Sequence, residues 1–300
     1  MLPNNRFFIP TAIILTIFLL LTAGFLLISS NKYHKDVPLS NERELKVNLD
    51  AGFGTVRISH CGSPTLFDAS ADLDRNYDLS DCLDYSIRDG IGYLNINTGG
   101  EVEERPKEKK KKGGFHMGGL ESSTWNFQFT DAVPISFDIQ LGLGKGVFDM
   151  TGLSIKDLNL STGASSVYLR FDQPNQSTIE DMTIEAGLSK FQADGLSNAN
   201  FNHLKFEGGV GSYSLDFGGK LSKEVDVDIE VGLGSLTITI PSEIGAKIMY
   251  EKNWIAHIDI GRDFTEQEEN NYFSSNYKTA RGKMNMRIEA GLGTVKIKRE

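Results

Sequence analysis

Closely spaced carboxylates are the residues of this sequence that come nearest to a catalytic arrangement. Asp181 precedes Glu185 by four positions, and Asp226, Asp228 and Glu230 alternate along one short segment. Paired carboxylates can cleave glycosidic bonds, and some proteins built from stacked β-coils cleave polysaccharides in this way. We expect these side chains to lie on solvated strand faces, with no row of His or Arg beside them. The pattern therefore favours a polar outer surface over a carbohydrate-active site.

Side chains that bind metals or cofactors are scattered along the chain. Metal ligands need to cluster, whereas the five histidines stand singly at His34, His60, His116, His203 and His257. The two cysteines, Cys61 and Cys82, belong to no C-x-x-C pair, and no Walker A, dinucleotide-binding, zinc-protease or nucleophile-elbow motif is present. The sequence thus predicts no catalytic residue, no cofactor and no metal site.

Charge bears on the choice of partner. The formal net charge is −9 and the pI is near 5.2, which argues against nucleic acid as the main partner. One segment, residues 104–119 (ERPKEKKKKGGFHMGG), is locally basic and rich in glycine. We expect a solvated loop there, and the alternative is a basic patch for anionic lipid or an envelope polymer.

An uncharged apolar segment stands near the N-terminus. Residues 7–29 read FFIPTAIILTIFLLLTAGFLLIS, and about 20 apolar residues suffice for a helix to span a bilayer. A cleaved signal peptide is the alternative, but its apolar core is normally about 7–15 residues long. We therefore expect a single-pass signal anchor that contacts the lipid bilayer, with a short tail at 1–6 and a juxtamembrane linker at 30–44.

The side of the membrane on which the body lies is predicted less directly. Lys32 and Lys35 follow the apolar segment and Arg6 precedes it, which by the positive-inside rule leans towards a cytoplasmic body. Long domains, however, translocate largely regardless of charge. A disulfide between Cys61 and Cys82 would require an oxidising compartment, although both could equally be unpaired small apolar residues. We expect an extracytoplasmic body.

One pattern recurs seven times in the body. The copies are residues 47–58, 137–148, 158–169, 182–193, 205–215, 227–238 and 286–297. In the last copy Ile288, Ala290 and Leu292 alternate as in a strand, and then Val295 and Ile297 continue one residue out of phase. A slip of one residue turns the side chains to the wrong face, so each copy needs a corner or a bulge at this point.

Glycine tolerates the backbone angles that such a corner requires. We therefore predict structural corner glycines at Gly52, Gly54, Gly142, Gly144, Gly163, Gly187, Gly209, Gly211, Gly232, Gly234, Gly291 and Gly293. Ser165 and Ser189 occupy two positions equivalent to Gly293. A Gly232→Val or Gly291→Val change should destabilise the body because a β-branched residue is incompatible with a positive φ. Four aromatic residues, Tyr168, Phe191, Tyr213 and Phe217, fall on positions that we expect to point inward.

The repeat predicts the fold class. The spacings between successive anchoring glycines from Gly142 to Gly232 are 21, 24, 22 and 23 residues, and stacked coils can bury an apolar row that a single coil cannot. We predict an all-β protein with a right-handed, β-helix-like β-solenoid body of about 20–24-residue coils, each of two or three short strands. A β-sandwich would alternate in the same way but would not repeat the slip.

Two regions depart from the repeat. Residues 45–130 form an irregular N-terminal β region that contains the loop 104–119, with one clear strand pair at 83–88 and 92–97. The repetitive domain covers 131–300, and within it we expect a second strand pair at 246–251 and 254–260, followed by a polar excursion at 262–282.

Two segments of the repeat carry a resemblance to a known family. IEVGLGSLTITIPSEIGAKI and YFSSNYKTARGKMNMRIEAGLGTVKI resemble bacterial toast-rack domains (DUF2154/DUF4097-like), which occur in LiaF-type cell wall-active antibiotics response proteins and in related adhesin candidates. The resemblance covers roughly residues 45–300 and implies a membrane-linked β-solenoid with no catalytic residues. LiaF-type members are associated with sensing or restraining envelope-stress signalling. This chain differs from them in having one membrane segment instead of several.

The functional expectation follows from the repeat, the anchor and the lack of a catalytic motif. We expect a non-enzymatic, membrane-anchored cell-envelope protein whose rigid surface contacts a protein or a polymer, in envelope-stress sensing or adhesion. One alternative is a carbohydrate-active enzyme on the same fold. Another is a scaffold that self-associates through the strand edges at the ends of the solenoid.

Overall fold

The computed structural model describes residues 32–62, 64–72, 79–99, 123–251 and 256–300. The expected anchor at 7–29 and the Lys-rich segment 104–119 lie outside these residues. Within the described part of the chain, no helix is long and apolar enough to cross a membrane. Its helical elements are two 3₁₀ turns, η1 (Leu79–Asp81) and η2 (Leu196–Ala199), and its strands are β1 to β16.

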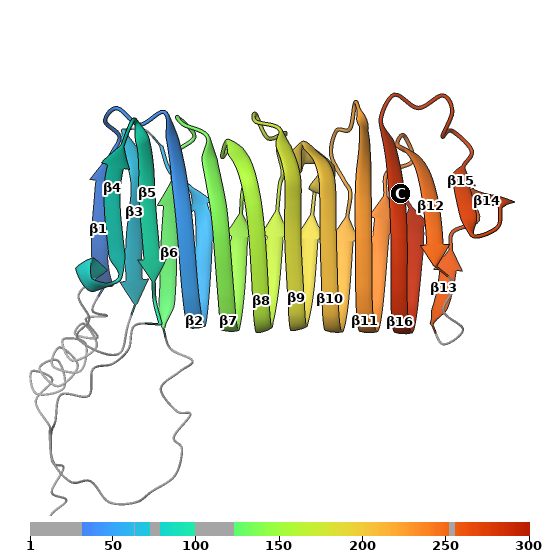
Figure 1. Cartoon of the computed structure of the whole chain (residues 1–300), viewed down its shortest axis with the longest axis horizontal. Helices are drawn as coiled ribbons and strands as arrows, with labels where there is room; N and C mark the ends of the chain where they lie inside the picture. The colour runs from blue at the N-terminus through green and yellow to red at the C-terminus, as the bar shows by residue number, and fades with distance from the viewer. Residues whose placement is uncertain (1–31, 63, 73–78, 100–122, 252–255) are drawn as a thin grey trace, which may run out of the picture.

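Seven long parallel strands form the centre of the molecule. They are 15–17 residues long: β2 (Glu44–His60), β7 (Ile135–Asp149), β8 (Ile155–Arg170), β9 (Ile179–Asp194), β10 (Phe201–Asp216), β11 (Glu224–Ile240) and β16 (Lys283–Arg299). Each strand runs along one layer, bends at the lower edge in Figure 1 and returns in the second layer. Each copy of the sequence pattern lies in one of these strands. A coil is therefore one bent strand, where the sequence predicted two or three short ones.

The core lies between the two layers. Before the bend Ile288 and Ala290 are buried, and after it Val295 and Ile297 are buried, as the shifted alternation requires. Phe206 packs against Phe191 on one side and Tyr213 on the other, with ring centroids 5.5 and 5.4 Å apart. Fully burying a side chain of this kind stabilises the fold by about 1.5–3 kcal/mol. The stack therefore holds together through a continuous apolar row that no coil could bury alone.

Tyr168 is the exception among the four predicted core aromatics. Phe191, Tyr213 and Phe217 are buried, but Tyr168 is half-buried and its hydroxyl donates to Asp194 Oδ2 at 2.8 Å. The register explains the difference, because Tyr168 pairs with the exposed Gln192 while Val167 pairs with Phe191. Tyr168 therefore belongs to the outward row.

The order of the strands departs from the order of the chain. The sheet runs β2-β7-β8-β9-β10-β11-β16 and then β12 (Gly245–Glu251). The last strand of the chain is thus inserted between β11 and β12, and pairs in parallel with both. The last two sequence copies are direct neighbours in space, and the segment between them folds outside the final copy.

Each end of the stack carries one coil that is split at its corner. At the N-terminal end β5 (Ile91–Asn97) and β6 (Thr124–Phe129) pair with the first and second halves of β2. At the C-terminal end β12 and β13 (His257–Ile260) pair with the two halves of β16. The strands expected at 246–251 and 254–260 are present as β12 and β13, but their pairing with each other is wrong, because they are separate halves of one coil and both pair with β16.

Short antiparallel strands cover the split coils. They are β4 (Leu83–Arg88) on β5, β3 (Thr65–Asp72) on β6, β1 (Lys32–Pro38) on β3, β15 (Asn271–Ser274) on β12 and β14 (Phe264–Glu268) on β15. The segment 30–44, expected as a linker, thus contains β1, and the polar excursion 262–282 contains β14 and β15. Short edge strands limit pairing with other chains, so neither end of the stack presents a long bare edge.

The corner glycines have two different structural reasons. The register sets Gly54, Gly144, Ser165, Ser189, Gly211, Gly234 and Gly293 in one row. Within this row φ is positive at Gly54 (110°), Gly144 (130°), Gly234 (140°) and Gly293 (138°), a conformation that side chains oppose. The preceding glycines, Gly232 and Gly291 among them, do not have a positive φ in this structure, so the positive φ expected at Gly232 and Gly291 is wrong.

Close stacking explains these preceding glycines. A Cβ placed on Gly291 would lie 2.5 Å from the carbonyl oxygen of Gly232, and one on Gly232 would lie 2.9 Å from that of Gly209. Backbone therefore packs on backbone along the row, and any side chain would force successive coils apart.

The structure distinguishes between the two interpretations of the cysteines that the sequence left open. No disulfide joins Cys61 to Cys82. The Cys61 N–H donates to Phe129 at the edge opposite the corners, whereas the Cys82 carbonyl accepts from Asn97, which pairs with Asp50 beside the corner. The two residues thus lie at opposite edges of the first coils. A disulfide between them therefore does not support an extracytoplasmic body. Burial, with the charges of Asp68 and Asp131, raises the pKa of the Cys61 thiol.

Candidate functional site

The strand halves that precede the corners present an outward surface, which we call the polar face. Because the strands are parallel and in register, equivalent residues form rows across it, with a spacing of about 4.8 Å. One row contains Tyr93, Lys46, Ser136, Asp157, Asp181, His203, Asp226 and Asn285, the next contains Asn95, Asn48, Asp138, Asn159, Thr183, Lys205, Asp228 and Arg287, and the third contains Asp50, Gln140, Ser161, Glu185, Glu207, Glu230 and Glu289.

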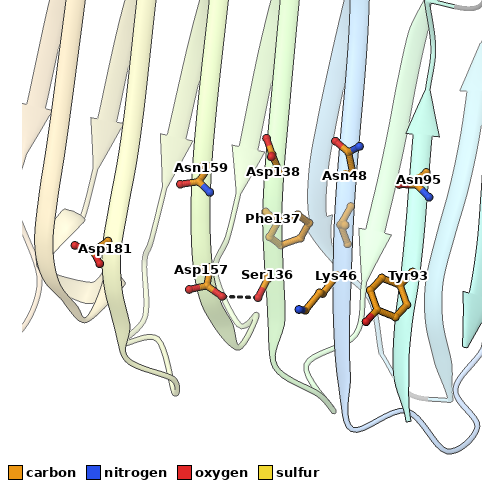
Figure 2. Close-up of a pocket in the computed structure, with 11 residues that line it drawn as sticks. Lys46, Asn48, Tyr93, Asn95, Ser136, Phe137, Asp138, Asp157, Asn159 and Asp181 are labelled. Carbon is orange, nitrogen blue, oxygen red and sulfur yellow. Dashed lines mark hydrogen bonds between the residues drawn. The ribbon is translucent and has the colours of Figure 1, made fainter. Parts of the chain in front are cut away.

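An open groove of about 420 Å³ lies on this face near the N-terminal end of the stack. Figure 2 shows two of the rows across it, with Tyr93, Lys46, Ser136 and Asp157 in one and Asn95, Asn48, Asp138 and Asn159 in the other. Asp181 closes the groove on the side of β9. Five successive coils, those of β5, β2, β7, β8 and β9, therefore build one groove from side chains that are distant in sequence.

The side chains of the groove leave hydrogen-bonding capacity free. Ser136 Oγ donates to Asp157 Oδ2 at 2.6 Å, which fixes one carboxylate. The side chains of Asn48, Asn95, Asn159 and Asp138, in contrast, make no hydrogen bond to any other residue in the described ranges. An amide offers two donors and an acceptor, and a carboxylate offers only acceptors. The groove can therefore both donate to and accept from a bound polar ligand.

Tyr93 supplies an aromatic surface at one end of the groove. Its ring lies 6.0 Å from Lys46 Nζ and 5.8 Å from the guanidinium carbon of Arg88, which is the range of a cation–π contact. Lys46 lies beside Tyr93 on the neighbouring strand (Figure 2). The half-buried ring presents a flat apolar wall next to the amides.

A histidine bridges two of the carboxylates that the sequence brought forward. His203 Nδ1 lies 3.2 Å from Asp181 Oδ1, and Nε2 lies 3.0 Å from Asp228 Oδ2. Burial opposes protonation of His203, but its hydrogen bonds to Asp228 and Asp181 and their charges outweigh burial and raise its pKa. A glycosidase holds its two carboxylates about 5–10 Å apart with the scissile bond between them. Here the imidazole occupies the space between Asp181 and Asp228.

The expectation that no His or Arg accompanies the carboxylates is therefore wrong. Lys205 forms an ion pair with Glu207, and Arg287 lies 2.6 Å from Glu251. His203 stands six residues before its anchoring glycine, as Asp181 and Asp226 do before theirs. Alignment of the copies on these glycines would have placed the three residues in one row.

The third row is a ladder of acidic side chains next to the corner. Glu185, Glu207, Glu230 and Glu289 follow one another on neighbouring strands. Like charges directly opposite each other destabilise a sheet, and water screens them here because Glu185, Glu230 and Glu289 are exposed. In the described part of the chain, no group of three or more His, Cys, Asp or Glu side chains has the geometry of a metal site.

Comparison with models of protein families identifies the family of the chain. The model described as the N-terminal domain of toast_rack, DUF2154, matches residues 28–193 and 173–239, which together are more than half of the chain. The chain belongs to the toast-rack family. The match to this toast-rack protein covers β1 to β11, whereas the sequence resemblance rested mainly on the segments of β11, β12 and β16.

Solved structures offer more distant likenesses. A candidate cell adhesion protein from Clostridium sporogenes is 24% identical, with a TM-score of 0.45 over 90% of this chain and 99% of that chain. A candidate adhesin from Bacteroides fragilis is 12% identical, with a TM-score of 0.31 over 90% and 98% of the two chains. A candidate lipid binding protein from Parabacteroides distasonis is 9% identical, with a TM-score of 0.29 over 90% and 98%. Such distant likenesses carry no argument about the function of this toast-rack protein. No curated protein matches it.

Proposed function

We propose that this toast-rack protein is a non-enzymatic cell-envelope protein, anchored through residues 7–29, that binds a hydroxyl-rich envelope polymer on its polar face. The observation that carries the proposal is the groove in Figure 2, where amides and carboxylates with free hydrogen-bonding groups stand in register beside Tyr93. Binding of this kind would serve adhesion or the sensing of envelope stress.

The chemistry of the groove suits a polysaccharide. Sugar hydroxyls both donate and accept hydrogen bonds, which matches the mixture of Asn, Asp and Lys side chains. The apolar face of a sugar ring can pack against Tyr93, because Tyr combines a flat apolar body with a polar end. A row that continues from coil to coil offers repeated contacts to an extended chain, which a small molecule could not use.

The carboxylates of the face support binding without cleavage. Asp157 accepts a hydrogen bond from Ser136, and Asp181 is engaged with His203. Retaining and inverting glycosidases both need two carboxylates that face each other across the scissile bond. The rival proposal, a carbohydrate-active enzyme, would need Asp138 and a neighbour to provide this pair.

A binding assay with the full-length protein tests the groove. The variants Tyr93→Ala, Asn48→Ala and Asn159→Ala are incubated with insoluble polysaccharide from the host envelope. We expect each to bind at least about tenfold more weakly than the parent, a loss of ~1.4 kcal/mol. The matched control is Ser214→Ala with Thr237→Ala, two half-exposed neighbours on the second layer. Unchanged binding of the groove variants would refute the assignment.

The same samples test the absence of catalysis. New reducing ends, measured after long incubation, would show that the face cleaves the polymer and would replace the binding proposal by the enzymatic one. Sizing of the unbound protein reports self-association, and a stable oligomer would support the scaffold alternative.

The proposed location is membrane-anchored, with the body outside the cytoplasm. Long bodies translocate largely regardless of the charges that flank an apolar segment. In a Cys61→Ser background, the exposed Ser166 is changed to Cys and intact cells are treated with a membrane-impermeant maleimide. Labelling of intact cells supports an extracytoplasmic body, and labelling only after permeabilisation would place the body in the cytoplasm.

A further inference from the structure

The tips of the corners form an exposed apolar row, which we call the corner ridge. It consists of Phe53, Leu143, Ala164, Leu188, Val210, Leu233 and Leu292, each paired with the next across the sheet. Leu188 is 63% exposed, Leu143 54% and Leu292 48%. Of the seven large hydrophobic side chains exposed in the described part of the chain, five belong to this ridge.

The fold does not require apolar side chains at these positions. Each tip residue stands between two corner positions, where the chain turns from one layer to the other, and its side chain points away from the core. Single exposed apolar residues are common on soluble proteins, but a contiguous apolar row marks a contact surface. The composition of the ridge therefore indicates that another surface covers it.

The start of the described chain shows what lies next to the ridge. Lys32 pairs with Asp72, Asp72 with Thr124, and Thr124 with Thr55. Thr55 directly follows Gly54, so the chain enters the body at the ridge edge. Two residues, Ser30 and Asn31, separate Ser29, the end of the expected anchor, from Lys32, and the three residue steps span at most about 10 Å. An anchor in the bilayer thus holds this edge close to the membrane surface.

The insertion of the Lys-rich segment falls at the same edge. Gly99 and Ser123 are the described residues on either side of it, and Thr55 donates its N–H to the Ser123 carbonyl at 2.9 Å. Gly99 lies against Gly52. Clustered lysines are attracted to phospholipid headgroups, so the position of this sequence agrees with a bilayer on that side. The proposed contact itself consists of the ridge side chains alone.

We propose that the corner ridge lies on the bilayer that holds the anchor, with the axis of the solenoid parallel to the membrane plane. The inference rests on the anchor proposed above. Apolar side chains at the membrane surface insert to about 5–10 Å, into the boundary of headgroups and acyl chains. On the second layer Lys145 and Lys190 flank the ridge and can reach lipid phosphates, whereas Glu185 and Glu230 flank it on the polar face. The groove rows farther from the corner stay accessible above the membrane.

Lipid-borne quenching of a fluorophore tests the contact. Full-length protein with Cys61→Ser and Cys82→Ala is reconstituted in phosphatidylcholine vesicles that contain a doxyl-labelled lipid. A fluorophore is attached at Leu233→Cys on the ridge or, as the matched control, at Gln176→Cys, an exposed residue of the β8–β9 loop at the opposite edge. We expect several-fold stronger quenching at position 233, and little change at high salt because the contact is apolar.

The outcomes separate the ridge from the anchor. Protein that floats with the vesicles but shows equal quenching at both positions would overturn the ridge contact and leave the anchor intact. Protein that does not float with the vesicles would overturn both. Energy transfer between ridge labels of separate copies, without lipid quenching, would assign the ridge to self-association and refute the membrane contact. Melting curves that match the parent show that the labelled variants are folded.

Discussion

Glycine performs two separate tasks at each corner, and they predict different sensitivities to mutation. At Gly291 the backbone angles suit other residues, but the carbonyl of Gly232 occupies the place of a Cβ. At Gly293 the φ of 138° is itself unfavourable for a side chain, and a Cβ would also overlap the Gly234 carbonyl. Gly62 has no neighbouring atom within 4 Å of a Cβ, so it provides an internal control.

Alanine substitutions should therefore rank in a fixed order. We expect Gly291→Ala to lower the free energy of unfolding by about 1–3 kcal/mol, as overpacking usually does, and Gly293→Ala to lower it further. Gly62→Ala should change it by less than about 0.5 kcal/mol. Urea unfolding of the three variants measures the order, and equal stability of Gly291→Ala and the parent would contradict the close stacking of the coils.

The pH dependence of stability should report the bridge between Asp181 and Asp228. The pKa of His203 is raised in the folded state, so the folded protein holds a proton more tightly than the unfolded chain. Its contribution is fully present below the unfolded pKa, about 6.5, and is lost as the pH rises through the folded pKa. The stability difference between the parent and His203→Gln should therefore be largest in mild acid and vanish in mild alkali. The difference in melting temperature, followed across this range, measures it, and a difference that does not depend on pH would refute the protonated bridge.

At the scale of the elements, buried polar side chains join the coils at the edge opposite the corners. Asn175, in the loop between β8 and β9, donates to the carbonyls of Ile155 at 2.7 Å and Ala199 at 3.1 Å. Its Oδ1 accepts from the Ile155 N–H at 2.8 Å. One buried amide thus satisfies the backbone of the coils on both sides, where the irregular loops have no ladder of their own.

Replacement of this amide should be costly. Asn175→Leu leaves the polar groups of Ile155 and Ala199 without partners, and each buried unsatisfied group costs about 1–3 kcal/mol. We expect a total loss of roughly 2–4 kcal/mol in the free energy of unfolding. The exposed Asn159, changed to Leu, is the control. A chemical-denaturation experiment in which both variants match the parent would show that the loops carry no such constraint.

The seven bent strands could be predicted from the sequence because their signals are local. The alternation of Ile288 and Ala290, the glycine corner and the shifted Val295 and Ile297 all lie within one copy. The pairing of the strands in the caps could not be predicted in this way, because β12 and β13 lack the glycine pattern and β1, β3, β14 and β15 pair antiparallel outside the repeat. The groove residues, such as Asn48 and Asp138, are ordinary outward polar residues, and only the pairing of β2 with β7 brings them together.

At the scale of the whole molecule, the insertion of β16 makes the end of the chain an internal element. β16 provides the parallel partner of β11 on one side and of β12 and β13 on the other. Until Lys283–Arg299 is in place, β11 presents a bare edge of 17 residues. The C-terminal cap therefore depends on the last residues of the sequence.

Truncation after Gly282 should therefore remove more than one strand. We expect β12 to β15 to lose their order with β16, because among the described strands β16 is the one through which they pair with the stack, and we expect the exposed β11 to promote aggregation. Deletion of Phe264–Glu268, the outermost strand β14, is the control and should leave the stack intact. Limited proteolysis measures the result, and protection of residues 245–274 in the truncated protein would contradict the topology.

The parallel pairing of the seven long strands makes the height of the molecule, from edge to edge, independent of its length along the stack. The seven long strands have similar lengths of 15–17 residues, so the distance from the glycine edge to the opposite edge is similar in each coil. Each coil adds one strand spacing, about 4.8 Å, along the axis. Duplication or loss of a whole copy would change the reach of the protein in steps of this size and leave its height unchanged. The length of the stack can therefore change by whole coils while the contacts between coils that remain neighbours are kept.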